Sequence, residues 1–318
     1  MFQKYLEDKK FFKLICGAGN QDIQEIEKLV EVYASAGANC VDISADVNVI
    51  NAVKTTLKKL NKDKDVFICV SIGVTDDIHL KKIKIKNSIC KLCGQCVSIC
   101  NRNALSIKQE ELFYYEKRCI GCGKCISACS VNNIEYYSKN NSIEDFLLSE
   151  NLSDIDCIEF HVSGENYDEI FKTWNILNEK YSGILSISIN RRSYSDEKLI
   201  SLLKELLMNR KPFTTIIQAD GNPMSGGKDD FHSTLQAVST ADLINQANLS
   251  VYTILAGGTN SKSSELAKLC GVNINGVAIG SYARLIVKDD INNNDINSAI
   301  SKAKLLIENS LNIKKATF

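Results

Sequence analysis

Short apolar runs alternate with longer amphipathic segments over most of the chain. The apolar runs have the length and composition of buried strands, and they occupy residues 12–18, 39–44, 66–73, 156–162, 184–190, 213–219, 251–256 and 276–280. Between and after them, apolar residues recur at the spacing of one helix face. These segments predict helices at residues 22–36, 47–60, 142–150, 168–180, 196–208, 231–247, 263–270 and 295–311.

The alternation gives eight strand–helix units. Eight parallel strands joined by crossover helices normally close into a (β/α)8 barrel, so we predict an α/β protein of this class. An open, doubly wound sheet is the alternative. In a barrel, functional groups gather at the carboxyl ends of the strands, and these ends are where we look for a site.

Composition narrows the class of protein further. The 318 residues are 44% hydrophobic and 24% charged, which is typical of a globular protein. The net charge of zero argues against a protein that binds nucleic acid through its phosphates. No apolar run approaches the roughly 18 residues of a membrane span, and the first residues have no apolar signal core. We therefore expect a cytoplasmic protein without a membrane span.

One stretch interrupts the alternation and contains most of the cysteines. Eight of the 13 cysteines form two copies of a C-x2-C-x2-C-x3-C motif, and each cysteine of the second copy follows its counterpart by 29 residues. This spacing is that of bacterial two-cluster ferredoxins, in which the fourth cysteine of each motif binds the cluster of the other motif. The stretch is therefore predicted to be an inserted ferredoxin-type domain.

We assign four cysteines to each of two [4Fe-4S] clusters on this basis. The first cluster takes Cys90, Cys93, Cys96 and Cys129, and the second takes Cys119, Cys122, Cys125 and Cys100. Each fourth cysteine is expected to begin a short helix. Strand-like runs at 82–86, 105–108, 112–115 and 134–137 predict two small antiparallel pairs. Two structural zinc sites are the alternative, although four cysteines in eleven residues fit zinc poorly.

The charge of the same stretch is distinctive. Residues 81–140 hold eleven basic and four acidic residues, a net charge of +7 that the rest of the chain balances to zero. This charge either compensates the anionic clusters or forms a docking face for an acidic electron carrier. Asn101 and Ser130 stand where the ferredoxin motif usually has proline. Each restores a backbone N–H, and a hydrogen bond from it to sulfur would raise a cluster's reduction potential.

Glycines follow the seventh and eighth predicted strands. Gly257 and Gly258 precede Thr259, and Gly280 precedes Ser281. At this end of a barrel, such loops let backbone N–H groups approach a phosphate. We expect a phosphorylated ligand here, with FMN as the candidate; the alternative is that the glycines only form tight turns.

Polar residues near other strand ends are further candidates for the barrel mouth. They are Lys13, Asp42, His161, Asn190, Arg191, Gln218 and Asp220. Their spacing identifies no acid–base pair, and we expect His161 to be a hydrogen-bonded structural residue. Of the five other cysteines, Cys16 precedes a glycine at a strand end and is a candidate reactive thiol. The remaining four are expected in the core, namely Cys40, Cys69, Cys157 and Cys270.

Several peptides outside the cysteine motifs are distinctive, namely FKLICGAGNQD, AGANCVDISAD, QADGNPMSGGKDD, LAGGTNSKSSELAKLCGV and GVAIGSYAR. Together with the paired motifs, they resemble the cyanobacterial light-dependent period family of iron–sulfur proteins over nearly the whole chain. The resemblance implies a redox-responsive input to the circadian clock that senses electron-transport or quinone redox state. Its partners would be an electron carrier or quinone, and clock proteins. Only the eight cluster cysteines carry over as functional residues.

Three functional hypotheses follow for a chain divided into barrel residues 1–78, a ferredoxin-type insert at 79–140 and barrel residues 141–318. The first is an electron-transfer protein and redox sensor whose clusters alter a partner surface. The second is an oxidoreductase whose barrel binds FMN or another phosphorylated cofactor that receives electrons from the insert. The third is a structural adaptor in which the clusters only stabilise the fold.

Overall fold

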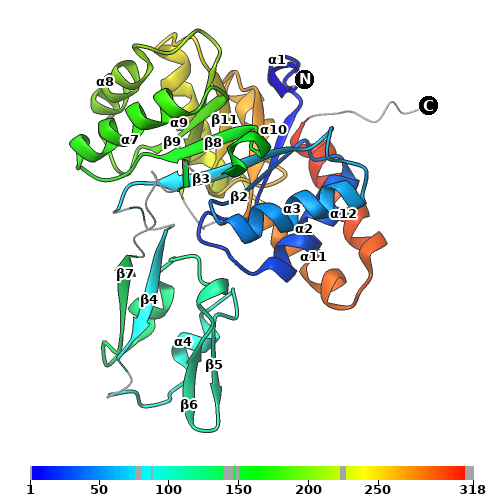
Figure 1. The fold of residues 1–318 in the computed structure, drawn as a ribbon, viewed down its shortest axis with the longest axis vertical. Coiled ribbons are helices and arrows are strands. Elements are labelled where there is room, and N and C mark those ends of the chain that lie inside the picture. The colour runs from blue at the N-terminus through cyan, green and yellow to red at the C-terminus, as the bar shows by residue number, and fades with distance from the viewer. Residues whose placement is uncertain are drawn as a thin grey trace.

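A computed structural model describes residues 2–75, 77, 80–86, 89–138, 146–147, 150–222 and 227–311. It shows a barrel surrounded by helices, with a smaller insert on one side (Figure 1). Among the described residues, no helix is long and apolar enough to cross a membrane.

Eight strands close into a barrel in the order β1-β12-β11-β10-β9-β8-β3-β2. They are β1 (Phe11–Ile15), β2 (Cys40–Ser44), β3 (Phe67–Gly73), β8 (Cys157–His161), β9 (Ile184–Asn190), β10 (Thr215–Asp220), β11 (Tyr252–Ala256) and β12 (Gly276–Ile279). Every neighbouring pair is parallel. The predicted (β/α)8 barrel is confirmed, and the open doubly wound sheet is wrong.

The helices cover the outside of the barrel. They are α2 (Ile23–Ala36), α3 (Val47–Lys59), α7 (Tyr167–Lys180), α8 (Asp196–Leu207), α9 (Phe231–Gln246), α10 (Ser263–Leu269), α11 (Ser281–Asn292) and α12 (Ile296–Ser310). Several begin at a polar residue whose side chain accepts a hydrogen bond from the first turn, as Asp22 does for α2 and Ser195 for α8.

The sequence prediction missed two helices, α1 (Phe2–Glu7) and α11. Each buries only two side chains, which is too few to give a visible helical period: Phe2 and Leu6 in α1, and Ala283 and Val287 in α11. The helix predicted at 142–150 falls mostly outside the described residues. Near its end, Glu150–Asp154 forms a short 3-10 helix.

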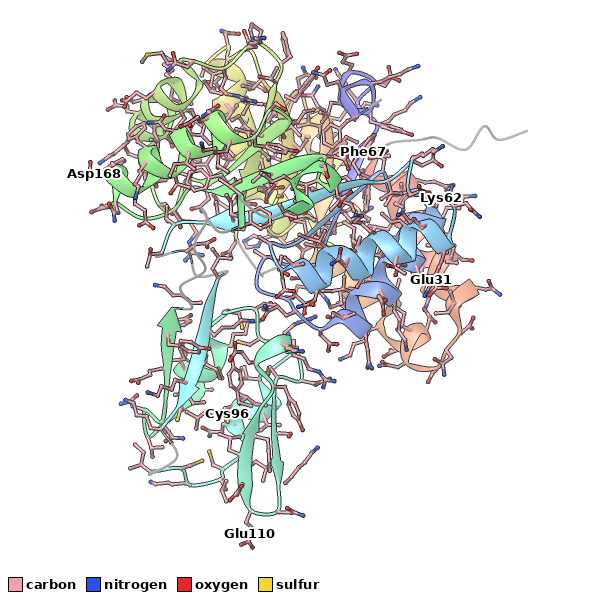
Figure 2. The ribbon with its side chains drawn as sticks, viewed as in Figure 1. Glu31, Lys62, Phe67, Cys96, Glu110 and Asp168 are labelled. Atoms are coloured by element: carbon pink, nitrogen blue, oxygen red, sulfur yellow. The ribbon has the colours of Figure 1, made fainter. Side chains whose placement is uncertain are left out.

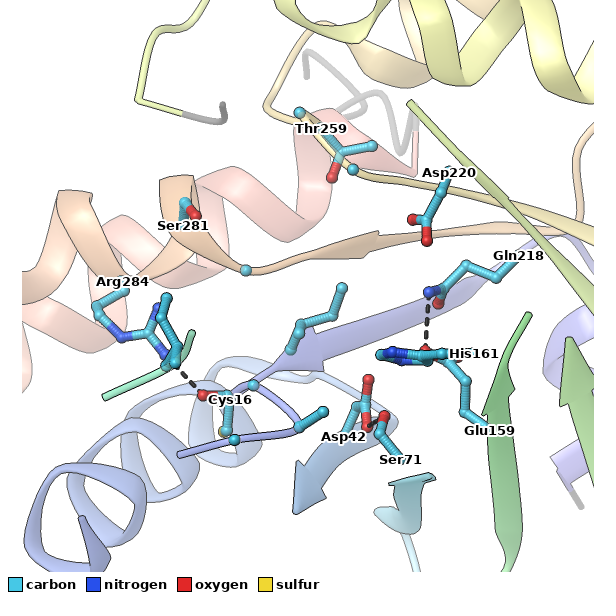
Figure 3. A pocket seen from close by; sticks show the side chains of 18 residues that line it. Cys16, Asp42, Ser71, Glu159, His161, Gln218, Asp220, Thr259, Ser281 and Arg284 are labelled. Carbon is cyan, nitrogen blue, oxygen red and sulfur yellow. Dashed lines mark hydrogen bonds and ion pairs between the residues drawn. The ribbon is translucent and has the colours of Figure 1, made fainter. Parts of the chain in front are cut away.

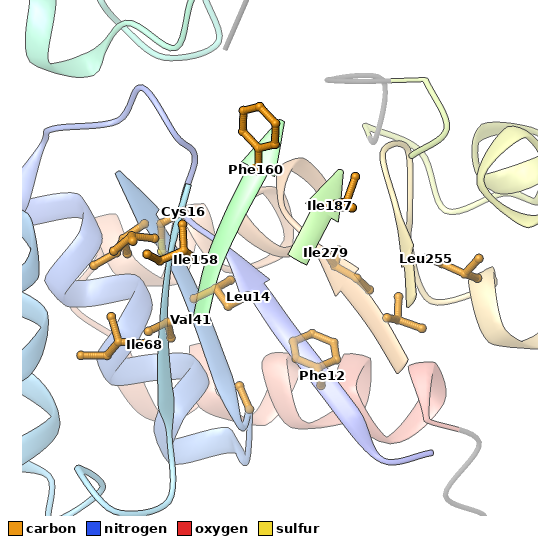
Figure 4. Packing of buried hydrophobic residues seen from close by; sticks show 14 of the residues in the cluster. Phe12, Leu14, Cys16, Val41, Ile68, Ile158, Phe160, Ile187, Leu255 and Ile279 are labelled. Atoms are coloured by element: carbon orange, nitrogen blue, oxygen red, sulfur yellow. The ribbon is translucent and has the colours of Figure 1, made fainter. Parts of the chain in front are cut away.

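Strand residues alternate between two faces of the barrel wall. Phe12, Leu14 and Val41 face outwards and join the large hydrophobic cluster beneath the helices (Figure 4). Lys13 lies between Phe12 and Leu14 and is therefore expected to face the barrel interior, where it is 2% exposed. Burying a charged side chain is costly unless it is paired, so the interior must contain its partner.

The insert lies between β3 and β8 and contains two antiparallel pairs. β4 (Lys81–Ile85) pairs with β7 (Ile134–Ser138), and β5 (Leu105–Lys108) pairs with β6 (Glu111–Tyr114). Both pairs were predicted. Figure 2 shows Cys96 inside this insert and Glu110 at the tip of the β5–β6 hairpin, away from the barrel.

One detail of the insert corrects the prediction. The short helices α4 (Gln95–Ser98) and α5 (Lys124–Ala128) contain the third cysteine of each motif and end just before the fourth. The fourth cysteine therefore follows a helix and does not begin one. The glycine before each helix, Gly94 or Gly123, has a positive φ, a backbone conformation that favours glycine.

Candidate functional site

The eight motif cysteines line two separate cavities in the insert. Cys90, Cys93, Cys96 and Cys129 line one cavity, and Cys119, Cys122, Cys125 and Cys100 line the other. Each cavity thus receives three cysteines from one motif and one from the other. All eight are free of disulfide bonds.

The thiols in each cavity are close enough to influence one another. Burial, followed by the neighbouring thiols Cys119, Cys122 and Cys100, raises the pKa of Cys125 to about 12. A metal centre binds such thiols as thiolates, and its positive charge would offset the repulsion between them. Two backbone N–H groups also point at cavity sulfurs: Ala104 N–H donates to Cys100 Sγ at 3.4 Å, and Asn133 N–H donates to Cys129 Sγ at 3.2 Å.

The arrangement bears on the choice between iron–sulfur clusters and zinc. Among the described residues, no three His, Cys, Asp or Glu side chains are positioned around a single ion. Four thiolates that each bind a different corner of an iron–sulfide cube are set wider apart than four ligands of one ion. Four cysteine thiols in each cavity are the donor set of a [4Fe-4S] cluster, and the spacing of the motif is that of two-cluster ferredoxins, so the residues present fit such a cluster.

A third pocket opens at the carboxyl ends of the barrel strands (Figure 3). The residues predicted to approach a phosphate all line it, namely Gly257, Gly258, Thr259, Gly280 and Ser281. Asp42, His161, Gln218 and Asp220 line it as well, as does Cys16. The pocket has a volume of about 100 Å³.

Three predicted mouth residues, Lys13, Asn190 and Arg191, are not among the residues that line this pocket, and the last two bind neighbouring groups. Arg191 pairs with Asp196 at the start of α8 and hydrogen-bonds Ser239. Asn190 accepts hydrogen bonds from the backbone of the turn that follows β9. Both side chains therefore satisfy local polar groups and do not line the mouth pocket.

The partner of Lys13 is Glu159 on β8, which the sequence analysis did not single out. The two side chains form a buried ion pair, and Asp42 on β2 lies 3.5 Å from the same ammonium nitrogen. Although burial opposes the charge, these two carboxylates raise the pKa of Lys13 well above its ordinary value. Glu159 could have been found in the sequence in the same way as Lys13 and Asp42, because each is a charged residue inside an apolar strand.

His161 extends this network to the pocket wall. Its Nδ1 lies 2.7 Å from Asp77 and its Nε2 lies 3.2 Å from Glu159. Burial opposes protonation, but Asp77 and Glu159 raise the pKa of His161 well above its ordinary value. Burial raises the pKa of Asp42 to about 6, in spite of Lys13. Both ring nitrogens of His161 are thus engaged by carboxylates, an arrangement that agrees with the structural role expected from the sequence.

The insert and the barrel meet through a group of partly buried charges. Arg102, which lines the second cysteine cavity, donates to both carboxylate oxygens of Glu25 in α2. Arg284 in α11 donates to the same carboxylate at 3.1 Å and lines the mouth pocket. Burial alone would raise the pKa of Glu25, but the two arginines lower it to about 2.

Ile120 joins the two sites directly. This residue follows the cluster ligand Cys119, and it lines both the second cysteine cavity and the mouth pocket. Nearby, the buried Lys82 donates to the carbonyl oxygens of Gly19 in the barrel and Cys119 in the insert, at 2.6 Å each. The second cavity is therefore the one beside the barrel mouth.

Two family models match the chain. The light dependent period A C-terminal domain matches residues 149–316, which is just over half of the chain, and the 4Fe-4S dicluster domain matches residues 89–133. The chain belongs to the light dependent period A family. Its relative in Synechococcus elongatus, named light dependent period A, is 29% identical over 298 residues, which span 88% of this chain and 81% of the relative.

The matched regions of this light dependent period A family member contain the whole cysteine site and part of the barrel mouth, whereas Cys16 and Asp42 lie outside both matches. The dicluster match contains all eight motif cysteines. The C-terminal match contains Glu159, His161, Gln218 and the glycine loops of the mouth. Arg284 also lies in this match, and sequence analysis missed it because α11 itself was missed.

Solved barrel structures are similar to this light dependent period A family member only in outline. Dihydrodipicolinate synthase DapA-2 from Bacillus anthracis is 10% identical with a TM-score of 0.43, covering 98% of this chain and 85% of that one. The (S)-3-O-geranylgeranylglyceryl phosphate synthase of Thermoplasma acidophilum is also 10% identical, with a TM-score of 0.48 and 97% of each chain covered.

Apart from Cys16, the remaining cysteines and the described histidine outside the pocket, His232, line neither site. Cys40, Cys69 and Cys157 are buried in the barrel as predicted, but Cys270 at the end of α10 is exposed, so its assignment to the core is wrong. Burial raises the pKa of Cys16 to about 12, so its thiolate is scarce at neutral pH. His232 lies in α9, and His79 is outside the described residues.

Proposed function

We propose that this chain is a cytoplasmic two-cluster iron–sulfur protein that senses redox state and conveys it to a clock. The observation that carries the proposal is the grouping of eight cysteines around two cavities, three and one from each motif. When bound, each cluster supplies reversible one-electron transfer. Membership of a family named for a light-dependent period supports the clock context, and free cysteines in this number suit a reducing compartment.

The ligand sets follow the two cavities. Cys90, Cys93, Cys96 and Cys129 would hold the first cluster, and Cys119, Cys122, Cys125 and Cys100 would hold the second. The domain division at 78/79 and 140/141 stays part of this proposal, because those residues lie outside the described parts of the chain.

A set of four variants tests the ligand sets. Anaerobically purified protein should contain about eight iron and eight sulfide per chain, as two four-iron cubes require. Cys100→Ser and Cys125→Ser should each lose the second cluster, so their remaining cluster should have the same midpoint potential. Cys96→Ser and Cys129→Ser should share the other potential. If Cys100→Ser instead matches Cys96→Ser, each motif binds its own cluster and our assignment fails.

The net charge of +7 on residues 81–140 supports an acidic electron carrier as the partner of the insert; a quinone is the alternative electron source, and clock proteins would receive the signal. Electrostatic steering should make the rate of cluster reduction by such a carrier fall steeply with salt. A rate that does not change with ionic strength would exclude docking through this charge.

An oxidoreductase that uses FMN is the second candidate, and the glycine loops at the mouth favour it. The size of the pocket does not, because about 100 Å³ is well below the ~300–1,000 Å³ of usual cofactor pockets. The phosphate would fit and the ring system would not. A visible spectrum of the anaerobic protein decides: iron–sulfur absorption alone supports the sensor, and an additional flavin band supports the enzyme.

A further inference from the structure

The geometry points to a binding site for a small phosphorylated polyol in the mouth of the barrel. The phosphate would lie between the glycine loops after β11 and β12, and hydroxyl groups of the ligand would face Gln218. This site goes beyond the redox function proposed above, because it assigns a ligand to the barrel itself.

The phosphate end is formed by backbone groups. Helix α11 begins with Ser281, after Gly280, and no side chain caps its first turn. The free N–H groups and the dipole of a twelve-residue helix therefore face the pocket, and both favour an anion. In the neighbouring loop after β11, Gly257 and Gly258 both have positive φ values and line the pocket, and without side chains their backbone leaves room for an anion to approach.

A second observation, independent of this helix, also indicates a ligand. Gln218 is 2% exposed and lines the pocket. Its Nε2 donates to Glu159 at 2.9 Å, which fixes the orientation of the amide. Its Oε1 is buried without any hydrogen-bond partner among the described residues. A buried acceptor of this kind is costly unless something donates to it, and a ligand hydroxyl would meet the need.

The rest of the pocket restricts the body of the ligand. Asp42, Glu159 and Asp220 line its floor and wall, so a second anionic group on the ligand would be repelled. Hydroxyl groups, which can donate to carboxylates and to Gln218, suit these surroundings. The enclosed volume of about 100 Å³ is well below the ~300–1,000 Å³ of usual ligand pockets, so the enclosed part of the ligand is small.

Calorimetric titration of the anaerobic full-length protein tests the site. The probes are glycerol 3-phosphate, inorganic phosphate and glycerol. We expect saturable binding of glycerol 3-phosphate, weaker binding of inorganic phosphate by about tenfold because the hydroxyl contacts are missing, and no binding of glycerol. Failure of both phosphate compounds to bind overturns the proposal and leaves a water molecule as the partner of Gln218.

Three variants locate the ligand. Ser281→Asp places a negative charge beside the phosphate and should weaken both phosphate compounds by about tenfold or more, while an acid in the first turn keeps the helix stable. Ser195→Asp is the matched control, because Ser195 caps α8 outside the pocket and aspartate is an equally good cap. Gln218→Met should remove the advantage of glycerol 3-phosphate over inorganic phosphate and leave inorganic phosphate binding unchanged.

The binding results of the variants test the two halves of the proposed site separately. Unchanged binding in Ser281→Asp excludes the phosphate position, and an undiminished advantage of glycerol 3-phosphate in Gln218→Met excludes the polyol contact. Iron and sulfide counts on the same samples separate this site from the proposed redox function. Full counts without phosphate binding refute only the site, whereas binding by protein that never holds clusters refutes only the redox function.

Discussion

Replacing Asp42 by asparagine should stabilise the barrel at neutral and alkaline pH. The buried network contains two side chains whose pKa is raised, Lys13 and His161, against three carboxyl groups, Asp42, Glu159 and Asp77. Burial raises the pKa of Asp42 to about 6, which makes it the group that takes up a proton.

The sign of the effect follows from the two states of the chain. The pKa of Asp42 is about 6 when folded and 3.8 in its ordinary state, so the folded chain holds a proton that the unfolded chain releases. The stabilising contribution is complete below pH 3.8 and is lost as the pH rises through about 6. The full shift is worth about 3 kcal/mol, and about 1.4 kcal/mol of it disappears between about pH 5 and pH 8.

Asparagine resembles the protonated acid and does not titrate, so the variant should not have this pH dependence. The excess stability of Asp42→Asn over the native chain should therefore grow by about 1.4 kcal/mol from about pH 5 to pH 8. Trp174 reports barrel unfolding in urea, because it is the only tryptophan, is 2% exposed and stacks on Phe160 of β8. The exposed Asp63 supplies the control variant Asp63→Asn.

Two results would refute this reasoning. An excess stability of Asp42→Asn that is the same at both pH values would show that Asp42 does not titrate in this range. A variant that is less stable than the native chain at pH 8 would show that the ionised carboxylate is needed beside Lys13.

Three further predictions concern other buried or cluster-linked groups. Lys13→Met should lower the free energy of unfolding, measured in urea, by about 3–5 kcal/mol, because it leaves buried carboxylates unpaired. Adding Glu159→Gln should restore part of this loss. If the losses of the two single variants simply add in the double variant, the pairing of Lys13 with Glu159 is contradicted. Glu25→Gln should speed hydrogen exchange on both sides of the contact between insert and barrel, and unchanged exchange would show that the contact does not depend on this carboxylate. Asn101→Pro with Ser130→Pro should lower the cluster potentials in a redox titration, whereas unchanged potentials would dismiss any role for those N–H groups.

The barrel strands were predictable because each is a short apolar run between polar turns, and their predicted ends differ from the observed ones by at most three residues. The cysteine groups were predictable because their spacing is set by the geometry of a cluster. Helix α11 was not, because only Ala283 and Val287 are buried on it. The helical spacing of apolar residues in a sequence arises from the side chains that a helix buries. A helix that buries few side chains therefore shows little of this spacing.

The partners inside the barrel were hidden for a different reason. Lys13 and Glu159 are 146 residues apart, and only closure of the barrel brings β1 and β8 to face one another across its interior. Each residue was visible as a charge in an apolar strand, but the pairing depends on tertiary structure. The same holds for Glu25, whose two arginines come from the insert and from α11.

Insertion after β3 explains how one chain can make the two sites interact. The insert leaves the barrel at the carboxyl end of a strand, so it lies beside the mouth, and Arg102 and Arg284 share one carboxylate, that of Glu25. An electron added to a cluster in the second cysteine cavity would attract Arg102 and weaken its ion pair with Glu25, and Arg284, which lines the mouth, would then pair with that carboxylate more strongly. Coupling free energies are reciprocal. An anion bound at the mouth would therefore change the free energy of reducing a cluster in the second cavity by the same amount that reduction changes the free energy of anion binding. Reduction of a cluster there and binding of an anion at the mouth should therefore oppose one another, and a sensor built this way would respond to both.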